Sequence, residues 1–223
     1  MEYTVDICGE INEKLVDEVV NELRAIYDFN CKMLDTYVNP PEVYETIELN
    51  IDSQGGLLSG FIAIRKEVDK LKESGVKVNT YCSGLALSCG FLLMLLGESR
   101  WGDPLASYMV HQGLVGANID KISSNARFLE HQGKIQEKMN EFVAENTLIT
   151  IEELEKYEEI DLYMTHEEAI ELGVLTKPKE VEEVELTVDQ CVEIMKQNGY
   201  KVKEEVEEVE EKPKTKKKVK KSE

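Results

Sequence analysis

The amino-acid sequence predicts an α/β fold in which βαβ units build a mainly parallel sheet. Thr46 to Ile51 alternates apolar and polar side chains as a strand does, and Val76 to Cys82 is a second extended apolar segment. Between them, Ile62, Ile64, Val68 and Leu71 fall mostly on one side of a predicted helix. Strand, helix and strand in this order predict a right-handed crossover between parallel strands. The 223 residues, 42% of them hydrophobic, suffice for one main domain with an appendage.

The segment before this unit repeats the same order. Tyr3 to Cys8 has a strand pattern, and a helical pattern with one apolar face follows from Ile11. The apolar positions of that face are Leu15, Val19, Leu23 and Ile26. Asp28 to Glu45 contains two prolines and shows no period, so it is predicted to be a loop.

A third strand and a long helix are expected in the second half of the chain. Ser107 to Gln112 has the strand pattern, and Ile119 to about Asn146 has an approximate apolar face at helical spacing. A helix of this length overhangs a domain of this size, which predicts that it packs against another subunit. Two capping boxes then predict the starts of short helices. These boxes are Thr150 with Glu153 and Thr165 with Glu168.

The formal net charge of −19 is carried almost entirely by residues 1–176. Residues 177–223 hold 13 of the 45 Asp and Glu residues and 12 of the 26 Lys and Arg residues. An acidic body of this kind repels nucleic acid and anionic membranes, so neither is an expected partner. In the tail, Glu204 to Glu211 is acidic and Lys212 to Lys221 is basic, which is typical of a solvated, largely disordered extension.

The N-terminal residues and the cysteines indicate the cellular compartment in which the protein is expected. The chain starts with neither the basic nor the apolar region of a signal peptide, and its longest apolar run, Phe91 to Leu96, is too short to span a bilayer. Five cysteines form no CxxC pair and no even set, which indicates reduced thiols in the cytoplasm. With three histidines in the chain, neither a metal nor another cofactor is expected.

Gly84 to Gly90 is the stretch that points to chemistry. It joins the strand ending at Cys82 to an apolar helix, so Ser88 is expected at a helix N-terminus, where backbone N–H groups lack intrahelical partners. Ser88 is therefore a candidate nucleophile, with the Cys89 N–H placed to stabilise an oxyanion. The alternative is that Ser88 is a simple N-cap.

Gly56, His111 and Asp161 are the other candidates. Gly55 and Gly56 follow the neighbouring strand, so the Gly56 N–H is a candidate second oxyanion donor, or the pair is a plain turn. His111 is of the residue type most often used as a general base near neutral pH, although a lone histidine in a strand can be a satisfied core residue. Asp161 either orients a histidine or is an ordinary surface acid. His166, inside a capping box, is assigned no role.

Four motifs in order make the chain resemble a known family. They are Asp52 to Gly56, Gly84 to Gly90, Tyr108 to Gln112 and Asp161 to Ala169. Together they resemble ClpP, the proteolytic subunit of the Clp protease, over residues 3–176, with the long helix in the place of that family's handle. Each motif alone is unspecific, whereas four in this order are a specific signal.

The resemblance implies a serine endopeptidase. By it, Ser88 is the nucleophile, His111 the general base and Asp161 the residue that orients His111, while Gly56 and Cys89 donate N–H groups to the oxyanion. The implied substrates are peptides and unfolded proteins, cleaved through an acyl-enzyme.

The same resemblance implies an architecture and partners. The fold is a ClpP/crotonase-like spiral of βαβ units, in a protease domain of residues 1–176 with a protruding handle at about 117–158. Subunits of the family form a heptameric ring, and the handles join two rings into a closed chamber. A partner ATPase of the AAA+ type unfolds substrates and feeds them in. Residues 177–223 are an addition to this domain.

The chain departs from the family pattern in several places. Gln54 and Gly113 stand where the family usually has proline, which makes both loops more flexible. The loop from Asp28 to Glu45 is longer than expected. The first strand begins so early that the axial loops that engage the ATPase are expected to be short or absent. These departures are typical of a divergent, phage-type member, and they weigh against ATPase partnership more than against hydrolysis.

Three other hypotheses compete with the serine peptidase. A non-catalytic ring or assembly subunit is suggested by Gln54, Gly113 and the tail. A crotonase-type acyl-CoA enzyme would use the two oxyanion donors but needs no activated serine. Cys89 could replace Ser88 as the nucleophile, but no second thiol or special base is evident beside it.

Overall fold

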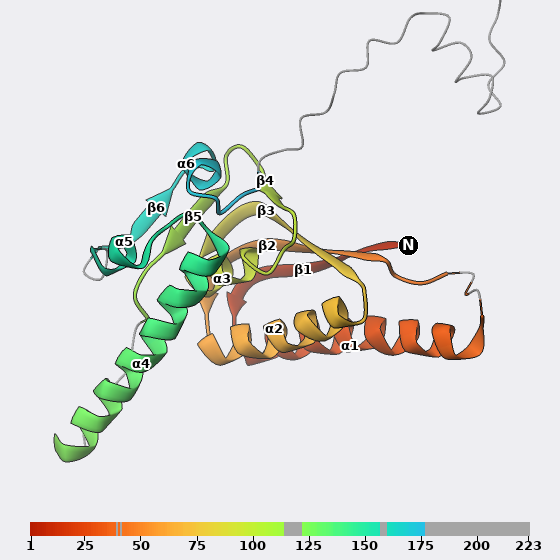
Figure 1. Cartoon of the computed structure of the whole chain (residues 1–223), viewed down its shortest axis with the longest axis horizontal. Helices are drawn as coiled ribbons and strands as arrows, with labels where there is room; N and C mark the ends of the chain where they lie inside the picture. Colours follow the sequence, from red (N-terminus) through yellow and green to blue (C-terminus); the bar gives the residue numbers. More distant parts are fainter. Residues whose placement is uncertain (39, 41, 114–121, 157–159, 177–223) are drawn as a thin grey trace, which may run out of the picture. The chain divides into compact units, whose positions relative to one another are not determined.

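A six-stranded sheet organises the computed structural model, which describes residues 1–38, 40, 42–113, 122–156 and 160–176 (Figure 1). The strands are β1 (Glu2–Ile11), β2 (Thr46–Gly56), β3 (Lys77–Leu87), β4 (Arg100–Gly102), β5 (Ser107–Val110) and β6 (Leu162–Met164). The helices are α1 (Glu13–Thr36), α2 (Leu58–Glu73), α3 (Cys89–Met94), α4 (Ile122–Asn146), α5 (Ile151–Lys156) and α6 (His166–Glu171). The described residues belong to one compact unit, Met1–Lys179, and the predicted extension 177–223 lies outside them.

The sheet has the order β1-β2-β3-β5-β6, with β4 paired to β3. All pairs are parallel except β5 with β6, which is antiparallel. The predicted α/β fold with a mainly parallel sheet is therefore confirmed. Because the carboxyl ends of parallel strands meet at one edge, the segments that follow β2, β3 and β5 come together there.

Helices α1 and α2 lie side by side along one face of the sheet (Figure 1). The side chains of β2 that face them, Ile47, Leu49 and Ile51, are fully buried and alternate with half-exposed polar residues. From α2, Ile64 and Val68 are also fully buried, whereas Ile62, predicted with them, is 57% exposed and lies outside the core. Each such side chain contributes about 1.5–3 kcal/mol to folding. The alternation on the strands and the helical period on α2 thus build one core.

Helix α1 corrects the predicted loop from Asp28 to Glu45. The helix continues to Thr36, so the connection is limited to residues 37–45. Asn30, which lacks the apolar character that the helical pattern required, is 6% exposed because its amide donates to the Tyr44 carbonyl and accepts from the Tyr44 N–H, both at 2.8 Å. A polar residue therefore continues the buried face of α1 by binding the incoming chain.

Strands β2 and β3 run further than the alternation predicted. They extend to Gly56 and Leu87, through the glycine-containing stretches that were expected to follow the strands, while β4 had no predicted counterpart. The strand that was predicted to include His111 ends one residue before it, at Val110.

The C-terminal part of the unit follows the predicted capping signals. Thr165 and Glu168 form a complete capping box at the start of α6, and Thr150 with Glu153 does the same for α5. The predicted start of the long helix, Ile119, lies outside the described residues, and α4 begins at Ile122.

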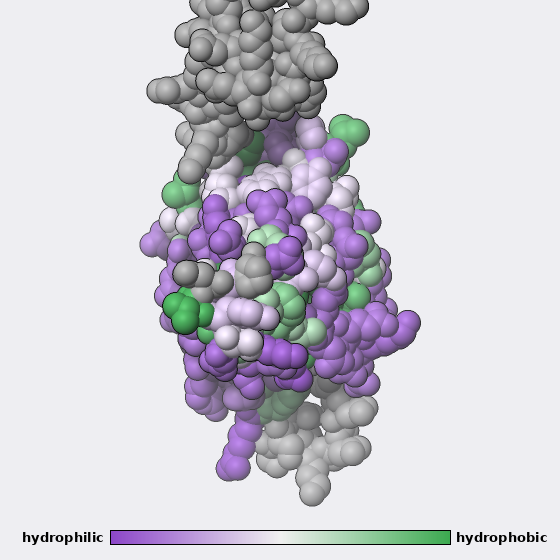
Figure 2. Space-filling model, turned by 90° about the vertical axis from the view of Figure 1, so that its right-hand side faces the viewer, coloured by the Kyte–Doolittle hydropathy of each residue, from purple (hydrophilic) through white to green (hydrophobic). Residues whose placement is uncertain are grey.

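Hydrophilic side chains predominate on the face of the molecule shown in Figure 2, where apolar ones form only small separate patches. Among the helices of the described residues, none is both long and apolar enough to cross a membrane.

Candidate active site

Ser88 is the single residue that joins β3 to α3. Its φ of 55° and ψ of −120° make it the only non-glycine residue with a positive φ among those described. Such a conformation costs about 1–3 kcal/mol and persists only where the surroundings impose it. Here the Ser88 N–H donates to the Met109 carbonyl at 2.9 Å, and the Ser88 carbonyl accepts from Leu92 N–H at 3.2 Å. Both neighbouring elements therefore hold the strained backbone.

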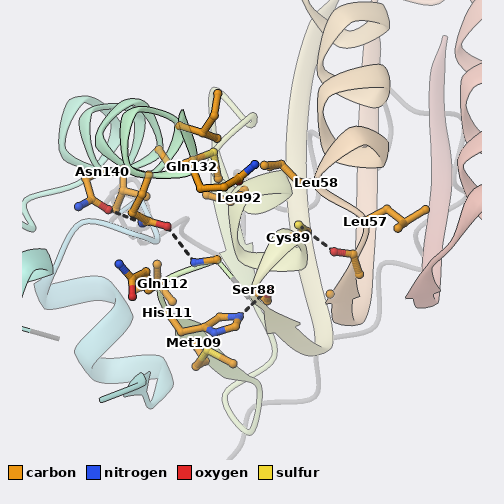
Figure 3. Close-up of a pocket in the computed structure, with 18 of the residues that line it drawn as sticks. Leu57, Leu58, Ser88, Cys89, Leu92, Met109, His111, Gln112, Gln132 and Asn140 are labelled. Atoms are coloured by element: carbon orange, nitrogen blue, oxygen red, sulfur yellow. Dashed lines mark hydrogen bonds between the residues drawn. The ribbon is translucent and has the colours of Figure 1, made fainter. Parts of the chain in front are cut away.

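The Ser88 hydroxyl does not cap α3. No side-chain capping hydrogen bond is present, and Ser88 Oγ lies 2.8 Å from Nε2 of His111 instead. The simple N-cap interpretation of Ser88 is therefore wrong. Figure 3 shows the two side chains pointing toward one another.

Gly55 fits closely against Ser88. Its φ is +102°, and a Cβ there would come within 2.7 Å of Ser88 Cβ and 2.8 Å of the Leu87 carbonyl oxygen. The next residue, Gly56, has a φ of +149° and lies against the backbone of Ile11, with which it pairs. The two glycines thus end strand β2 rather than form a free turn. Gly56 is the candidate that the sequence indicates, whereas the residue in contact with Ser88 is Gly55, a contact that no local pattern reveals.

Ser53 holds this glycine pair in place and was not predicted. The side chain is 1% exposed; its hydroxyl donates to the Gly9 carbonyl at 2.6 Å and accepts from the Gly55 N–H at 3.1 Å. A buried hydroxyl between two backbone groups satisfies both and fixes their separation. Only the pairing of β1 with β2 brings Gly9 and Ser53 together, so no local sequence signal could have revealed it.

Cys89 is buried beside Ser88. Its thiol lies 3.3 Å from the Gly56 carbonyl oxygen, and Figure 3 shows the sulfur directed toward that carbonyl. Burial raises the pKa of the Cys89 thiol, against smaller opposing effects of the hydrogen bonds with Gly56 and Ser88. A neutral, hydrogen-bonded thiol is a poor nucleophile, which argues against Cys89 as the attacking group.

Asp161 reaches His111 through the pairing of β5 with β6. Val110 lies opposite Leu162 in this antiparallel pair, so the next residues outward are His111 and Asp161. Oδ1 of Asp161 lies 3.9 Å from Nδ1 of His111, and the Asp161 side chain is 49% exposed. That distance is too long for a hydrogen bond, so the two are close but not bonded.

A cavity of about 840 Å³ opens beside the Ser88–His111 pair. It is enclosed by the end of β2, by α3, by the residues that follow β5, and by α4 (Figure 3). Its apolar lining includes Leu58, Leu92, Met109, Ile135, Met139 and Val143. An apolar cleft next to a serine–histidine pair can hold a peptide side chain while the hydroxyl meets the backbone carbonyl. Within the described part of the chain, no cluster of three or more His, Cys, Asp or Glu residues could hold a metal ion.

Comparison with known proteins decides the family. The family described as Clp protease matches residues 1–181 of this chain. The chain belongs to the Clp protease family. This Clp protease homologue is 29% identical over 178 residues to the ATP-dependent Clp protease proteolytic subunit 2 of Chlamydia trachomatis serovar D, an alignment that covers 78% of each chain. The protein of the same name from Chlamydia trachomatis serovar A matches with the same identity and coverage.

The match confirms the resemblance that the four motifs indicated. The protein is a divergent ClpP-like proteolytic subunit and a protease of the Clp kind. The family match favours peptide-bond hydrolysis over the acyl-CoA chemistry considered from the sequence.

Proposed function

We propose that the protein is a serine endopeptidase that hydrolyses peptides and unfolded polypeptides. The observation that carries this proposal is the 2.8 Å contact between Ser88 Oγ and His111 Nε2, made by a serine in a strained strand-to-helix junction. A serine hydroxyl is inert near neutral pH unless a base takes its proton, and His111 is in position to do so. Membership of a protease family supports the same chemistry.

The proposed reaction proceeds through an acyl-enzyme. Ser88 Oγ attacks the carbonyl carbon of the scissile bond as its proton moves to His111 Nε2, giving a tetrahedral oxyanion. This intermediate collapses with cleavage of the C–N bond, and His111 gives the proton to the departing amine. Water, deprotonated by His111, then releases the acid and regenerates Ser88.

Two backbone N–H groups, of Gly56 and Cys89, are proposed to stabilise the oxyanion. Cys89 is the first residue of α3, where N–H groups have no intrahelical partner. Loss of one such donor typically costs about 3 kcal/mol of the activation barrier.

Asp161 is proposed to orient His111 and to stabilise its charged form. The gap of 3.9 Å between Oδ1 and Nδ1 must shorten by about 1 Å to become a hydrogen bond. The Asp161 side chain is half exposed, so it has room to rotate toward the ring.

The proposed assembly follows that of the family. Residues 1–176 would be a protease domain that forms heptameric rings, two of which the handles would join into a closed chamber, and residues 177–223 would be a separate extension. An AAA+ ATPase is the proposed partner for folded substrates, and the cytoplasm the proposed compartment. The relatives that match are themselves named proteolytic subunits of an ATP-dependent protease.

Labelling with a fluorophosphonate tests the proposal. The reagent should form an adduct on Ser88, located by mass spectrometry of tryptic peptides, and Ser88→Ala should abolish both adduct and peptide cleavage. Ser83→Ala is the matched control, because Ser83 is exposed on the same strand and does not line the cavity. Cleavage that persists in Ser88→Ala would refute the assignment.

The non-catalytic ring subunit remains the second candidate, favoured by the distance between Asp161 and His111. A ring-sized particle by native mass spectrometry, without any adduct on Ser88, would support that role instead.

A further inference from the structure

The three residues from His111 to Gly113 lie between β5 and α4. The Gly113 N–H donates to Oε1 of Gln136 at 2.8 Å, and Nε2 of Gln136 donates to Oδ1 of Asn140 at 2.8 Å. Asn140 is 9% exposed and Gln136 is half-buried. Figure 3 draws these two hydrogen bonds as dashed lines beside Asn140. Two amide side chains of α4 thus hold the backbone two residues beyond His111.

The hydrogen bond between Gly113 and Gln136 holds residues 111–113, which follow β5 and make no sheet pairing. On the strand side, Met109 pairs with Leu87 and Val110 with Leu162. Beyond Val110 the strand has ended, and the His111 ring itself makes one hydrogen bond, to Ser88, with Asp161 still 3.9 Å away. The backbone that carries the imidazole is therefore fixed on one side by β5 and on the other by Gln136.

The part of α4 that follows Gln136 packs into the hydrophobic core. Val143 is 2% exposed, and the Phe142 ring packs against Phe61 with 5.6 Å between ring centroids. The guanidinium carbon of Arg65 lies 4.7 Å from the centroid of the same Phe142 ring. Gln136 lies between one and two turns before these residues, so its amide is presented from an anchored stretch of helix.

We infer that Gln136 is a positioning residue for His111, and that it links the placement of α4 to the Ser88–His111 pair. The link requires an N–H at position 113, which glycine supplies and proline could not. It rests on the proposed function, because its consequence for catalysis exists only if His111 serves as the base for Ser88.

Gln136→Ala removes the acceptor of the Gly113 N–H and the hydrogen bond from Gln136 to Asn140. The rate of fluorophosphonate labelling at saturation is expected to fall about threefold to tenfold, since one net hydrogen bond no longer restricts His111, while the half-saturating reagent concentration stays unchanged. Gln136→Glu keeps an oxygen acceptor for the Gly113 N–H and should label within about twofold of wild type. Glu137→Gln, an exposed neighbour on the same helix, is the matched control.

Position 113 provides the second half of a double-mutant cycle. Gly113→Pro deletes the donor and should reproduce the defect of Gln136→Ala, and the double variant should be no slower than either single one. Gly113→Ala keeps the N–H, and its Cβ would lie 3.5 Å from Gln136 Oε1, an ordinary contact, so it should label like wild type. Additive losses in the double variant would overturn the link.

Hydrogen exchange tests the hydrogen bond between Gly113 and Gln136 independently of catalysis. Peptides covering residues 111–113 should exchange slowly in wild type and at least about tenfold faster in Gln136→Ala, because an unbonded N–H is open to solvent. Unchanged exchange in Gln136→Ala would show that Gln136 does not hold this segment, even if the enzyme labels well. A wild-type protein that does not label at all refutes the proposed function instead. The exchange result then decides by itself whether Gln136 holds the segment.

Discussion

At the scale of single residues, the site depends on a strained serine and on the glycine that touches it. Ser88 adopts a φ of 55°. Gly55, with a φ of +102°, leaves a space for the Ser88 side chain, and a Cβ at position 55 would fill that space. The hydroxyl is thereby directed to His111 rather than to the first turn of α3. A strained serine and a glycine in a conformation that other residues rarely adopt thus lie next to each other at the place where chemistry is proposed.

Gly55→Ala should therefore impair the site strongly. A Cβ within 2.8 Å of both Ser88 and Leu87 forces the nucleophile to shift, and we expect fluorophosphonate labelling to fall by at least about tenfold, with about 1–3 kcal/mol lost from the free energy of unfolding. Gly75→Ala is the control: its φ is +90° but a Cβ there meets nothing within 4 Å. That variant should lose about 1 kcal/mol of stability through strain alone and label normally. Equal labelling by both variants would contradict the steric argument.

At the scale of elements, the long helix α1 and the short strand β6 show how contacts across the fold override local patterns. Asn30 lets α1 continue past the end of its apolar stripe, because both polar groups of its amide bind the backbone of Tyr44. Strand β6 has only three residues, but its antiparallel register with β5 places Asp161 beside His111.

Asn30→Ala should destabilise the protein without affecting the site. It leaves the part-buried N–H and C=O of Tyr44 without their partners, a loss of about 1–3 kcal/mol that urea denaturation can measure. Asn30→Asp keeps the acceptor for the Tyr44 N–H and should be less damaging. Lys32→Ala, on the exposed side of α1, should change stability by less than about 0.5 kcal/mol. No difference between the variants at positions 30 and 32 would show that the Tyr44 contact contributes nothing.

At the scale of the whole molecule, the net charge opposes the proposed assembly. Residues 1–176 carry nearly all of the net charge of −19, and subunits of equal charge repel when they approach. In the proposed assembly, apolar contacts between subunits would have to overcome this repulsion, whose range depends on salt.

Assembly should therefore strengthen with ionic strength. Between about 0.01 M and about 0.15 M salt, the Debye length falls from about 30 Å to about 8 Å, which screens most of the repulsion between subunits. Sedimentation velocity at constant protein concentration should show a larger share of ring-sized particles at the higher salt. A decrease with salt would mean that attractive charge pairs, rather than apolar contacts, hold the assembly.

Much of the fold followed from local patterns because their physical cause is local. The alternation of Thr46 to Ile51, the helical period of α2 and the capping box at Thr165 each reflect neighbours within one element, and each was predicted correctly. The extension of α1 to Thr36 and strand β4 were not predicted, because their stabilising partners, Tyr44 for one and strand β3 for the other, lie elsewhere in the chain.

The sequence by itself determined the α/β class, the candidates Ser88, His111 and Asp161, and the resemblance to the Clp protease family, because residue types and their order are written in it. Tertiary structure alone decided that Ser88 Oγ points at His111 instead of capping α3, that Gly55 and Ser53 shape the surroundings of the nucleophile, and that Asp161 lies near His111 without bonding to it. These are relations between segments far apart in the chain. They depend on strand register and on the space left between backbones, and no stretch of sequence carries either quantity alone.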